Sequence, residues 1–254
     1  MKVEEKTPSL EARNKHIDAI REELLRAFGD RIRSAIVYGS TLNRDFCIYS
    51  DYDILLTIKD PSVRTLRALR TIKLSFEKDN VLIDFNVHDE DDLPEYRKDL
   101  FWHNNRGLYV LRELELYGKV IIGDNPFVGE VVDTKRMLVE AVRVINSMKY
   151  QARKMLINKD INASTNKILL MKWCIYSSLY VLASRGEFPI DRREAVSRFA
   201  ELFNPPIDPK IFLHIKITRP DNITDEDVRA AYEFLVYLDK MIFEEYTYSH
   251  SILS

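Results

Sequence analysis

The sequence contains few cysteines, and none has the spacing of a metal-binding or disulfide motif. Cys47 and Cys174 are the only two among 254 residues, and no Cys-x-x-Cys pair occurs. Disulfide frameworks and structural zinc sites need several cysteines or histidines at short, regular spacing. Both kinds of scaffold are therefore excluded, and a reducing, cytoplasmic location is expected.

Glycine and proline are also scarce, at 7 and 9 residues, and no segment has low complexity. Chains that remain disordered are typically poor in apolar residues, whereas 46% of this chain is hydrophobic. We therefore expect a chain that is folded throughout, and its length suits two modest domains.

An excess of positive charge is missing as well. The 38 lysines and arginines are balanced by 40 acidic residues, which gives a formal net charge of −2. Proteins that bind long nucleic acids gain much of their affinity by neutralising phosphates, so such a partner is disfavoured, although a local basic cleft stays open.

No apolar run is long enough to span a membrane. The longest, residues 168–183, is interrupted by Lys172 and reads as a buried helix. The first ten residues carry charges where a signal peptide would have an apolar segment. No membrane partner and no secretion are expected.

The first half of the chain mixes strand and helix patterns. Between residues 81 and 87 the pattern alternates, which places Asp84 and Asn86 on one face of a strand. In the helix predicted over residues 93–117, a break is expected near Gly107. The predicted helices are residues 10–28, 63–76 and 93–117, and the predicted strands are residues 35–38, 52–58, 81–87 and 120–122.

The second half shows helical periodicity alone. Aromatic residues at helical spacing, among them Trp173, Tyr176 and Tyr180, are predicted to be core. The predicted helices are residues 133–158, 163–185, 192–203 and 224–246. We therefore predict an α+β fold, in which a small mixed-sheet domain (residues 1–125) precedes an all-α helical bundle (residues 126–254).

A Gly-Ser pair follows the first predicted strand. Gly39 and Ser40 lie where that strand ends and a helical turn begins. Backbone N–H groups and a hydroxyl can face phosphate oxygens there, and glycine has no side chain to block their approach. The pair predicts an anion-binding turn.

Three aspartates follow on neighbouring predicted strands. Asp51 and Asp53 are two residues apart, so their carboxylates are predicted to leave the same face, and Asp84 lies on the alternating strand. Carboxylates that close repel unless a cation neutralises them, and hard oxygen ligands favour Mg²⁺. Asp84 is expected either to complete a two-metal site or to act as a general base.

This pattern resembles the nucleotidyltransferase superfamily that includes DNA polymerase β. Within it, the sequence is similar to aminoglycoside nucleotidyltransferases, both the kanamycin enzymes and the streptomycin/spectinomycin adenylyltransferases. The similarity is carried by Gly39-Ser40, by Asp51-Tyr52-Asp53, by residues 87–90 and by residues 118–126.

The resemblance implies a fold, a reaction and a set of site residues. Two Mg²⁺ ions would be held by Asp51, Asp53 and Asp84, and ATP would be the donor. Gly39, Ser40 and Ser50 would bind the nucleotide. The acceptor would be a hydroxyl of a small molecule lying between the two domains, and pyrophosphate would be released.

Lys149 is a further candidate nucleotide ligand. It lies one helical turn from Arg153 in the predicted bundle, where both side chains either reach phosphates or face solvent.

Several functional alternatives remain open. The acceptor can be a protein hydroxyl, as in antitoxin-type adenylyltransferases, or the chain can bind nucleotide without turnover. RNA tailing is a weaker alternative because of the acidic charge balance. A homodimer is also left open.

Overall fold

The chain divides into two compact units, Met1–Val131 and Val132–Ser254. The structure, a computed structural model, describes residues 7–46, 50–91, 107–129, 134–158, 163–218 and 222–251. Residues 93–106 of the helix predicted over 93–117 therefore lie outside the described residues, as does Cys47.

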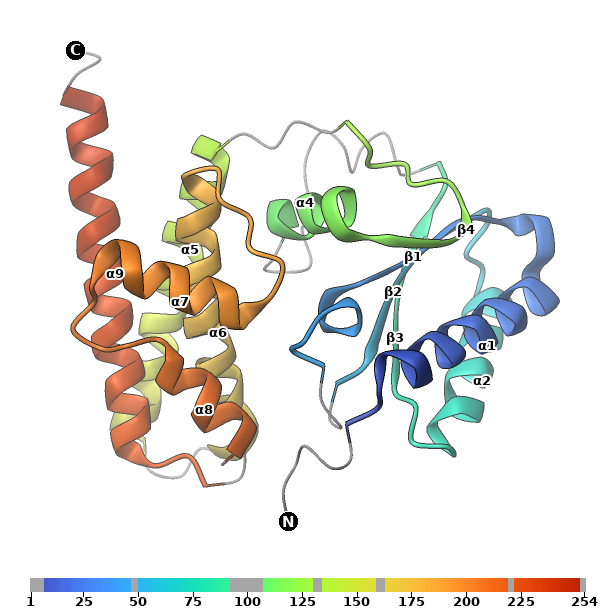
Figure 1. Ribbon diagram of the computed structural model, residues 1–254, viewed down its shortest axis with the longest axis horizontal. Helices are drawn as coiled ribbons and strands as arrows, with labels where there is room; N and C mark the ends of the chain where they lie inside the picture. Colours follow the sequence, from blue (N-terminus) through green and yellow to red (C-terminus); the bar gives the residue numbers. More distant parts are fainter. Residues whose placement is uncertain are drawn as a thin grey trace. The chain divides into compact units, whose positions relative to one another are not determined.

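The first unit is built on a four-stranded mixed sheet (Figure 1). The strand order is β3-β2-β1-β4, with β1 antiparallel to both of its neighbours and β2 parallel to β3. The elements are α1 (Leu10–Phe28), η2 (Gly29–Arg31), β1 (Ile32–Tyr38), η3 (Gly39–Leu42), β2 (Tyr52–Ile58), α2 (Val63–Glu77), β3 (Ile83–Asp89), α4 (Gly107–Tyr117) and β4 (Lys119–Gly123).

Two helices cover one face of this sheet. Apolar residues of α1 such as Ile20 and Leu24 pack in one core with Leu69 of α2 and with Ile54 and Ile83 of the strands. Successive side chains of a strand point to opposite faces of the sheet, so polar strand residues such as Asp53 and Asp84 point away from this core. The site described below therefore lies on the face opposite α1 and α2.

Polar side chains begin the first two long helices of this unit. The hydroxyl of Ser9 accepts a hydrogen bond from the backbone N–H of Ala12, and Ser62 accepts one from Thr65 in the same way. Such N-caps satisfy N–H groups that have no partner within the helix. They explain why α1 and α2 begin at Leu10 and Val63.

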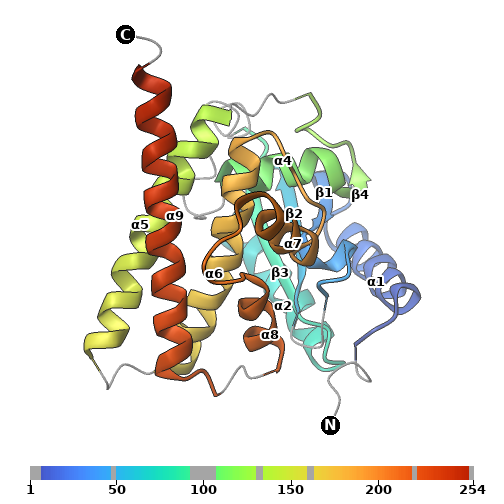
Figure 2. The same ribbon diagram turned by 60° about the vertical axis from the view of Figure 1, so that its left-hand side comes forward.

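Helices make up the described part of the second unit (Figure 2). The helix α6 contacts each of the other four, and Trp173, Tyr176 and Tyr180 are buried in it, as predicted. The elements are α5 (Thr134–Ile157), α6 (Ala163–Ser184), α7 (Arg192–Phe203), α8 (Lys210–Thr218) and α9 (Asp225–Ser251). The predicted fold class, a small mixed sheet followed by helices, is confirmed.

Several details differ from the sequence-based expectation, since β1 begins at Ile32 rather than at residue 35 and α9 continues to Ser251 rather than ending at residue 246. The strand expected over residues 81–87 is observed two residues later, at Ile83–Asp89, because the backbone before it turns at Asn80, which has a positive φ of 59°. The helix α8 was not predicted, because its nine residues span fewer than three turns, too few for the helical period to stand out.

Candidate active site

The Gly-Ser pair lies in a tight turn directly after β1. Gly39 has a φ of 72°, in the left-handed region that favours glycine, and it starts the short 3₁₀-helix η3. A Cβ at this position would overlap Oδ2 of Asp53 and lie 3.3 Å from its Cγ. Glycine is therefore needed here for two reasons, the backbone conformation and the space that Asp53 occupies.

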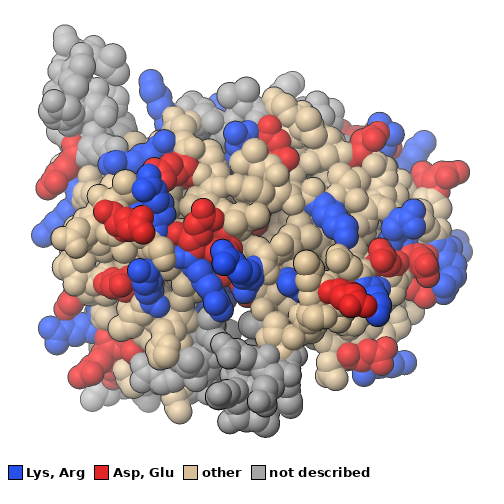
Figure 3. Space-filling view, viewed as in Figure 1, with Lys and Arg blue, Asp and Glu red and all other residues tan. Residues whose placement is uncertain are grey.

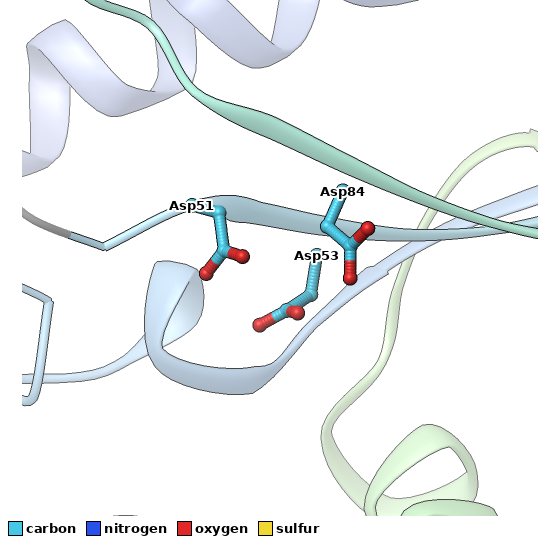
Figure 4. Close-up of side chains that lie close together, drawn as sticks. All are labelled: Asp51, Asp53 and Asp84. Atoms are coloured by element: carbon cyan, nitrogen blue, oxygen red, sulfur yellow. The ribbon is translucent and has the colours of Figure 1, made fainter. Parts of the chain in front are cut away.

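The three predicted aspartates come together in the structure. Oxygen atoms of Asp51, Asp53 and Asp84 all lie within 4.8 Å of one another. Figure 4 shows the three carboxylates gathered at the start of β2 and β3. Sheet register produces this arrangement, because Asp53 pairs with Asp84 across the parallel strands and with Tyr38 across the antiparallel ones.

The three carboxylates differ in their exposure. Asp51, which lies directly before β2 rather than within it, and Asp84 are exposed, whereas Asp53 is more buried. No hydrogen bond or ion pair of the Asp51 or Asp84 carboxylate is found within the described part of the chain. Their oxygens are thus available to an external ligand.

This donor set fits a hard divalent cation. Three carboxylates converge, and their mutual repulsion would be relieved by a cation. Mg²⁺ prefers such oxygen ligands and usually shares them with substrate phosphates. Among the described residues the cluster offers carboxylate oxygens alone, a donor set that suits Mg²⁺ better than zinc.

Ser40 lies in the turn beside the aspartates. The residue is buried, at 5% exposure, and its hydroxyl has no hydrogen-bond partner among the residues that the structure describes. The neighbouring Thr41 hydroxyl donates to the backbone carbonyl of Asp51 over 3.3 Å, which ties the turn to the aspartate segment. Ser50, the other predicted nucleotide ligand, is partly buried and directly precedes Asp51.

Lys149 lies in the second unit, in the middle of α5. Its Nζ pairs with the carboxylate of Asp239 on α9 and donates to Asn146 over 3.3 Å. The solvent-facing alternative for Lys149 is wrong, because the residue is buried at 9% exposure. Nucleotide binding by Lys149 stays a prediction, in which phosphate would compete with Asp239.

Two residues of α1 that were not predicted from the sequence contact the η3 turn and the aspartate segment. Arg13 donates from Nη1 to the backbone carbonyls of Thr41 and Asn43, over 2.8 and 2.9 Å. His16 Nδ1 lies 2.7 Å from the hydroxyl of Tyr52, the residue between the two aspartates. The only sequence signal was two polar residues, three apart, beside the apolar stripe of an amphipathic helix.

Burial shifts the ionisation of this group. Desolvation raises the pKa of Tyr52 to about 12, although the nearby Arg13 charge acts in the opposite direction. Burial likewise lowers the pKa of Arg13, and Tyr52 opposes that shift. Tyr52 is therefore a neutral hydrogen-bond partner at ordinary pH, with its ring turned away from the carboxylates.

Charges elsewhere show no concentration of one sign on the face that is drawn. The described acidic and basic side chains of both units are interspersed there (Figure 3). No helix among the described residues is long and apolar enough to cross a membrane.

Comparison with known proteins supports the fold. No protein-family model and no curated protein sequence matches the chain. Among solved structures, it is similar to a spectinomycin adenyltransferase, AAD(9) from Enterococcus faecialis, whose crystal structure contains ATP and spectinomycin. The TM-score is 0.53 at 14% identity, over 90% of this chain and 98% of that one.

The chain thus has the fold of a nucleotidyltransferase, a small mixed-sheet domain followed by helices. The sequence-based resemblance to aminoglycoside nucleotidyltransferases is confirmed at the level of the fold, and the likeness extends over nearly the whole chain.

Proposed function

We propose that the chain is a metal-dependent nucleotidyltransferase that transfers AMP from MgATP to a hydroxyl of a small molecule, such as an aminoglycoside-like compound. The observation that carries this proposal is the convergence of three carboxylates within 4.8 Å, beside a turn that glycine keeps open. Nucleotidyl transfer needs such a cluster next to a phosphate-binding turn, because the reaction is mostly positioning and charge stabilisation.

The proposed residue roles follow from position. Asp51, Asp53 and Asp84 would hold the metal, and Mg²⁺ would neutralise charge on the triphosphate and on the transition state. The backbone N–H groups of the η3 turn and the Ser40 hydroxyl would bind the terminal phosphates. Ser50 is assigned to the same phosphates because it directly precedes Asp51.

The bond changes are those of an in-line displacement. The acceptor oxygen forms a bond to the α-phosphorus, while the bond from that phosphorus to the β-phosphate oxygen breaks and pyrophosphate leaves. The acceptor's proton passes to a base. Asp84 is exposed and therefore suited to accept it, unless its oxygens are fully engaged as metal ligands.

A small-molecule acceptor is supported by the structural likeness. The similar adenyltransferase was crystallised with both ATP and spectinomycin, and the likeness includes the helical unit as well as the sheet. A protein acceptor and nucleotide binding without turnover are the alternatives that the following experiment separates.

The test is pyrophosphate release by the full chain with each of the four nucleoside triphosphates and Mg²⁺, across a panel of aminoglycosides and other polyols. We expect release with ATP that depends on both the metal and a hydroxyl-bearing acceptor, with the acceptor gaining the mass of AMP. Labelling of protein rather than small molecule would favour the protein-modifying alternative. ATP binding with no release under any condition would contradict the proposal.

A further inference from the structure

The helix α1 contacts both halves of the proposed catalytic site, although it contributes no carboxylate to it. The Nη1 atom of Arg13 donates to two backbone carbonyls, those of Thr41 and Asn43, at the end of the η3 turn. The last carbonyls of a helical turn have no partner within it, and a cation that donates to them also opposes the negative end of the turn. Arg13 therefore caps the turn that holds Ser40.

Arg13 does this without an ion pair. No carboxylate in the described ranges pairs with it, its Nε is buried without a hydrogen-bond partner there, and its guanidinium lies over the ring of Phe46 at 5.2 Å. Partial burial of a cation costs free energy. Because Arg13 donates to two carbonyls of a single turn, its hydrogen bonds offset that cost by fixing the turn. The two hydrogen bonds from Arg13 therefore fix the position of the turn.

The second contact from α1 reaches the aspartate segment. His16, one helical turn after Arg13, contacts the hydroxyl of Tyr52, and the Tyr52 ring also packs edge-on against Phe46 at 5.1 Å. Because successive strand residues point to opposite faces, fixing Tyr52 toward α1 fixes its neighbours Asp51 and Asp53 toward the other side. One helix thus sets the position of the turn relative to the aspartates.

We propose that Arg13 is a positioning residue for nucleotidyl transfer: its guanidinium holds the Gly39–Leu42 turn at the distance from Asp51 and Asp53 that lets one triphosphate reach both. This inference rests on the proposed function. It assigns Arg13 no contact with substrate, so its effect is on the binding and alignment of the nucleotide.

The experiment compares Arg13→Met with Arg21→Met in the full chain. Arg21 is a matched control because it lies on the same helix and also donates to a backbone carbonyl, that of Ile121 over 2.8 Å, away from the aspartates. Methionine keeps an unbranched side chain at both positions, and Arg13→Lys controls for the greater burial of Arg13 because it keeps both a long side chain and the positive charge.

Two readouts decide the inference. Amide hydrogen exchange over residues 40–43 is expected to accelerate at least about tenfold in Arg13→Met and to stay unchanged in Arg21→Met, because two hydrogen bonds to the turn are lost. The KM for MgATP is expected to rise by about tenfold or more in Arg13→Met alone, with Arg13→Lys recovering part of the loss through the N–H donors of its ammonium group.

Failure of the inference is distinguishable from failure of the proposed function. If the wild type releases pyrophosphate while Arg13→Met matches Arg21→Met in exchange and in KM, the role of Arg13 is overturned and the enzyme assignment stands. If the wild type turns over no nucleotide, the proposed function fails and the nucleotide-aligning role of Arg13 falls with it. Unchanged exchange in the turn overturns the role of Arg13 whatever the activity.

Discussion

Gly39 and Asp53 occupy adjoining space, and this single contact joins the turn η3 to the cluster of three carboxylates. The positive φ of Gly39 directs the chain away from β1, and the missing side chain leaves room for the Asp53 carboxylate. Spacing in the sequence predicted the two motifs separately, but it contained no information that they touch. Their contact arises from the antiparallel pairing of Tyr38 with Asp53.

Gly39→Ala is expected to lower kcat/KM for pyrophosphate release by about a hundredfold or more, because the new Cβ would displace the Asp53 carboxylate, which we propose as a metal ligand. Gly129→Ala is the control, since Gly129 also has a positive φ, of 83°, but a Cβ there meets nothing within 4 Å. Both variants carry similar backbone strain, so a comparable loss of activity in both would argue against the contact with Asp53.

Tyr52 gives the fold a dependence on alkaline pH. Its folded-state pKa, about 12, lies above the unfolded value of 10.0, so its contribution to stability is complete below pH 10 and is lost as pH rises toward 12. Between about pH 9 and pH 11 the free energy of unfolding should fall by roughly 1 kcal/mol more in the wild type than in Tyr52→Phe. Urea titrations at the two pH values measure this difference, and equal falls in both proteins would contradict the burial of an ionisable Tyr52.

At the scale of elements, the parallel pairing of β2 with β3 brings the third carboxylate to the site. Local patterns in the sequence predicted β2, α1 and α7 with the bounds that are observed, because period and capping signals are encoded within each segment. The order of the strands and the contacts of Arg13 could not be predicted in this way. Arg13 and Thr41 are far apart in sequence, and only the packed sheet decides which helix residue reaches the turn.

The strand β3 also offers a matched test of Asp84. Asp84→Asn is expected to reduce kcat by about a hundredfold or more, whereas Asp89→Asn, at the opposite end of the same strand, should leave it nearly unchanged. Titration with Mg²⁺ then separates the two roles of Asp84. A higher Mg²⁺ requirement indicates a metal ligand, and an unchanged requirement with a lost acidic limb in the pH–rate profile indicates a base. Full activity in Asp84→Asn would contradict any role of Asp84 in the reaction.

The two units of the chain have similar lengths, but the residues of the candidate site belong to only one of them. The three carboxylates, the glycine turn and the α1 contacts all belong to the first unit, Met1–Val131. For the second unit, the sequence predicted a helical bundle and buried aromatic residues, and the structure confirms both. Ligands of that unit could not be predicted from its sequence, because a buried helix such as α6 is patterned for packing rather than for a ligand.

The most direct test of the central claim compares the wild type with Asp53→Asn, using ATP labelled on the α-phosphate, Mg²⁺ and the best acceptor from the panel. Asparagine keeps the shape of the side chain but removes the charge that would hold the cation. The wild type should transfer the label to the acceptor and lose this activity when Mg²⁺ is chelated, while Asp53→Asn should remain folded and transfer about a thousandfold less or none. Near-wild-type transfer by Asp53→Asn, or transfer that continues without a divalent cation, would contradict the account.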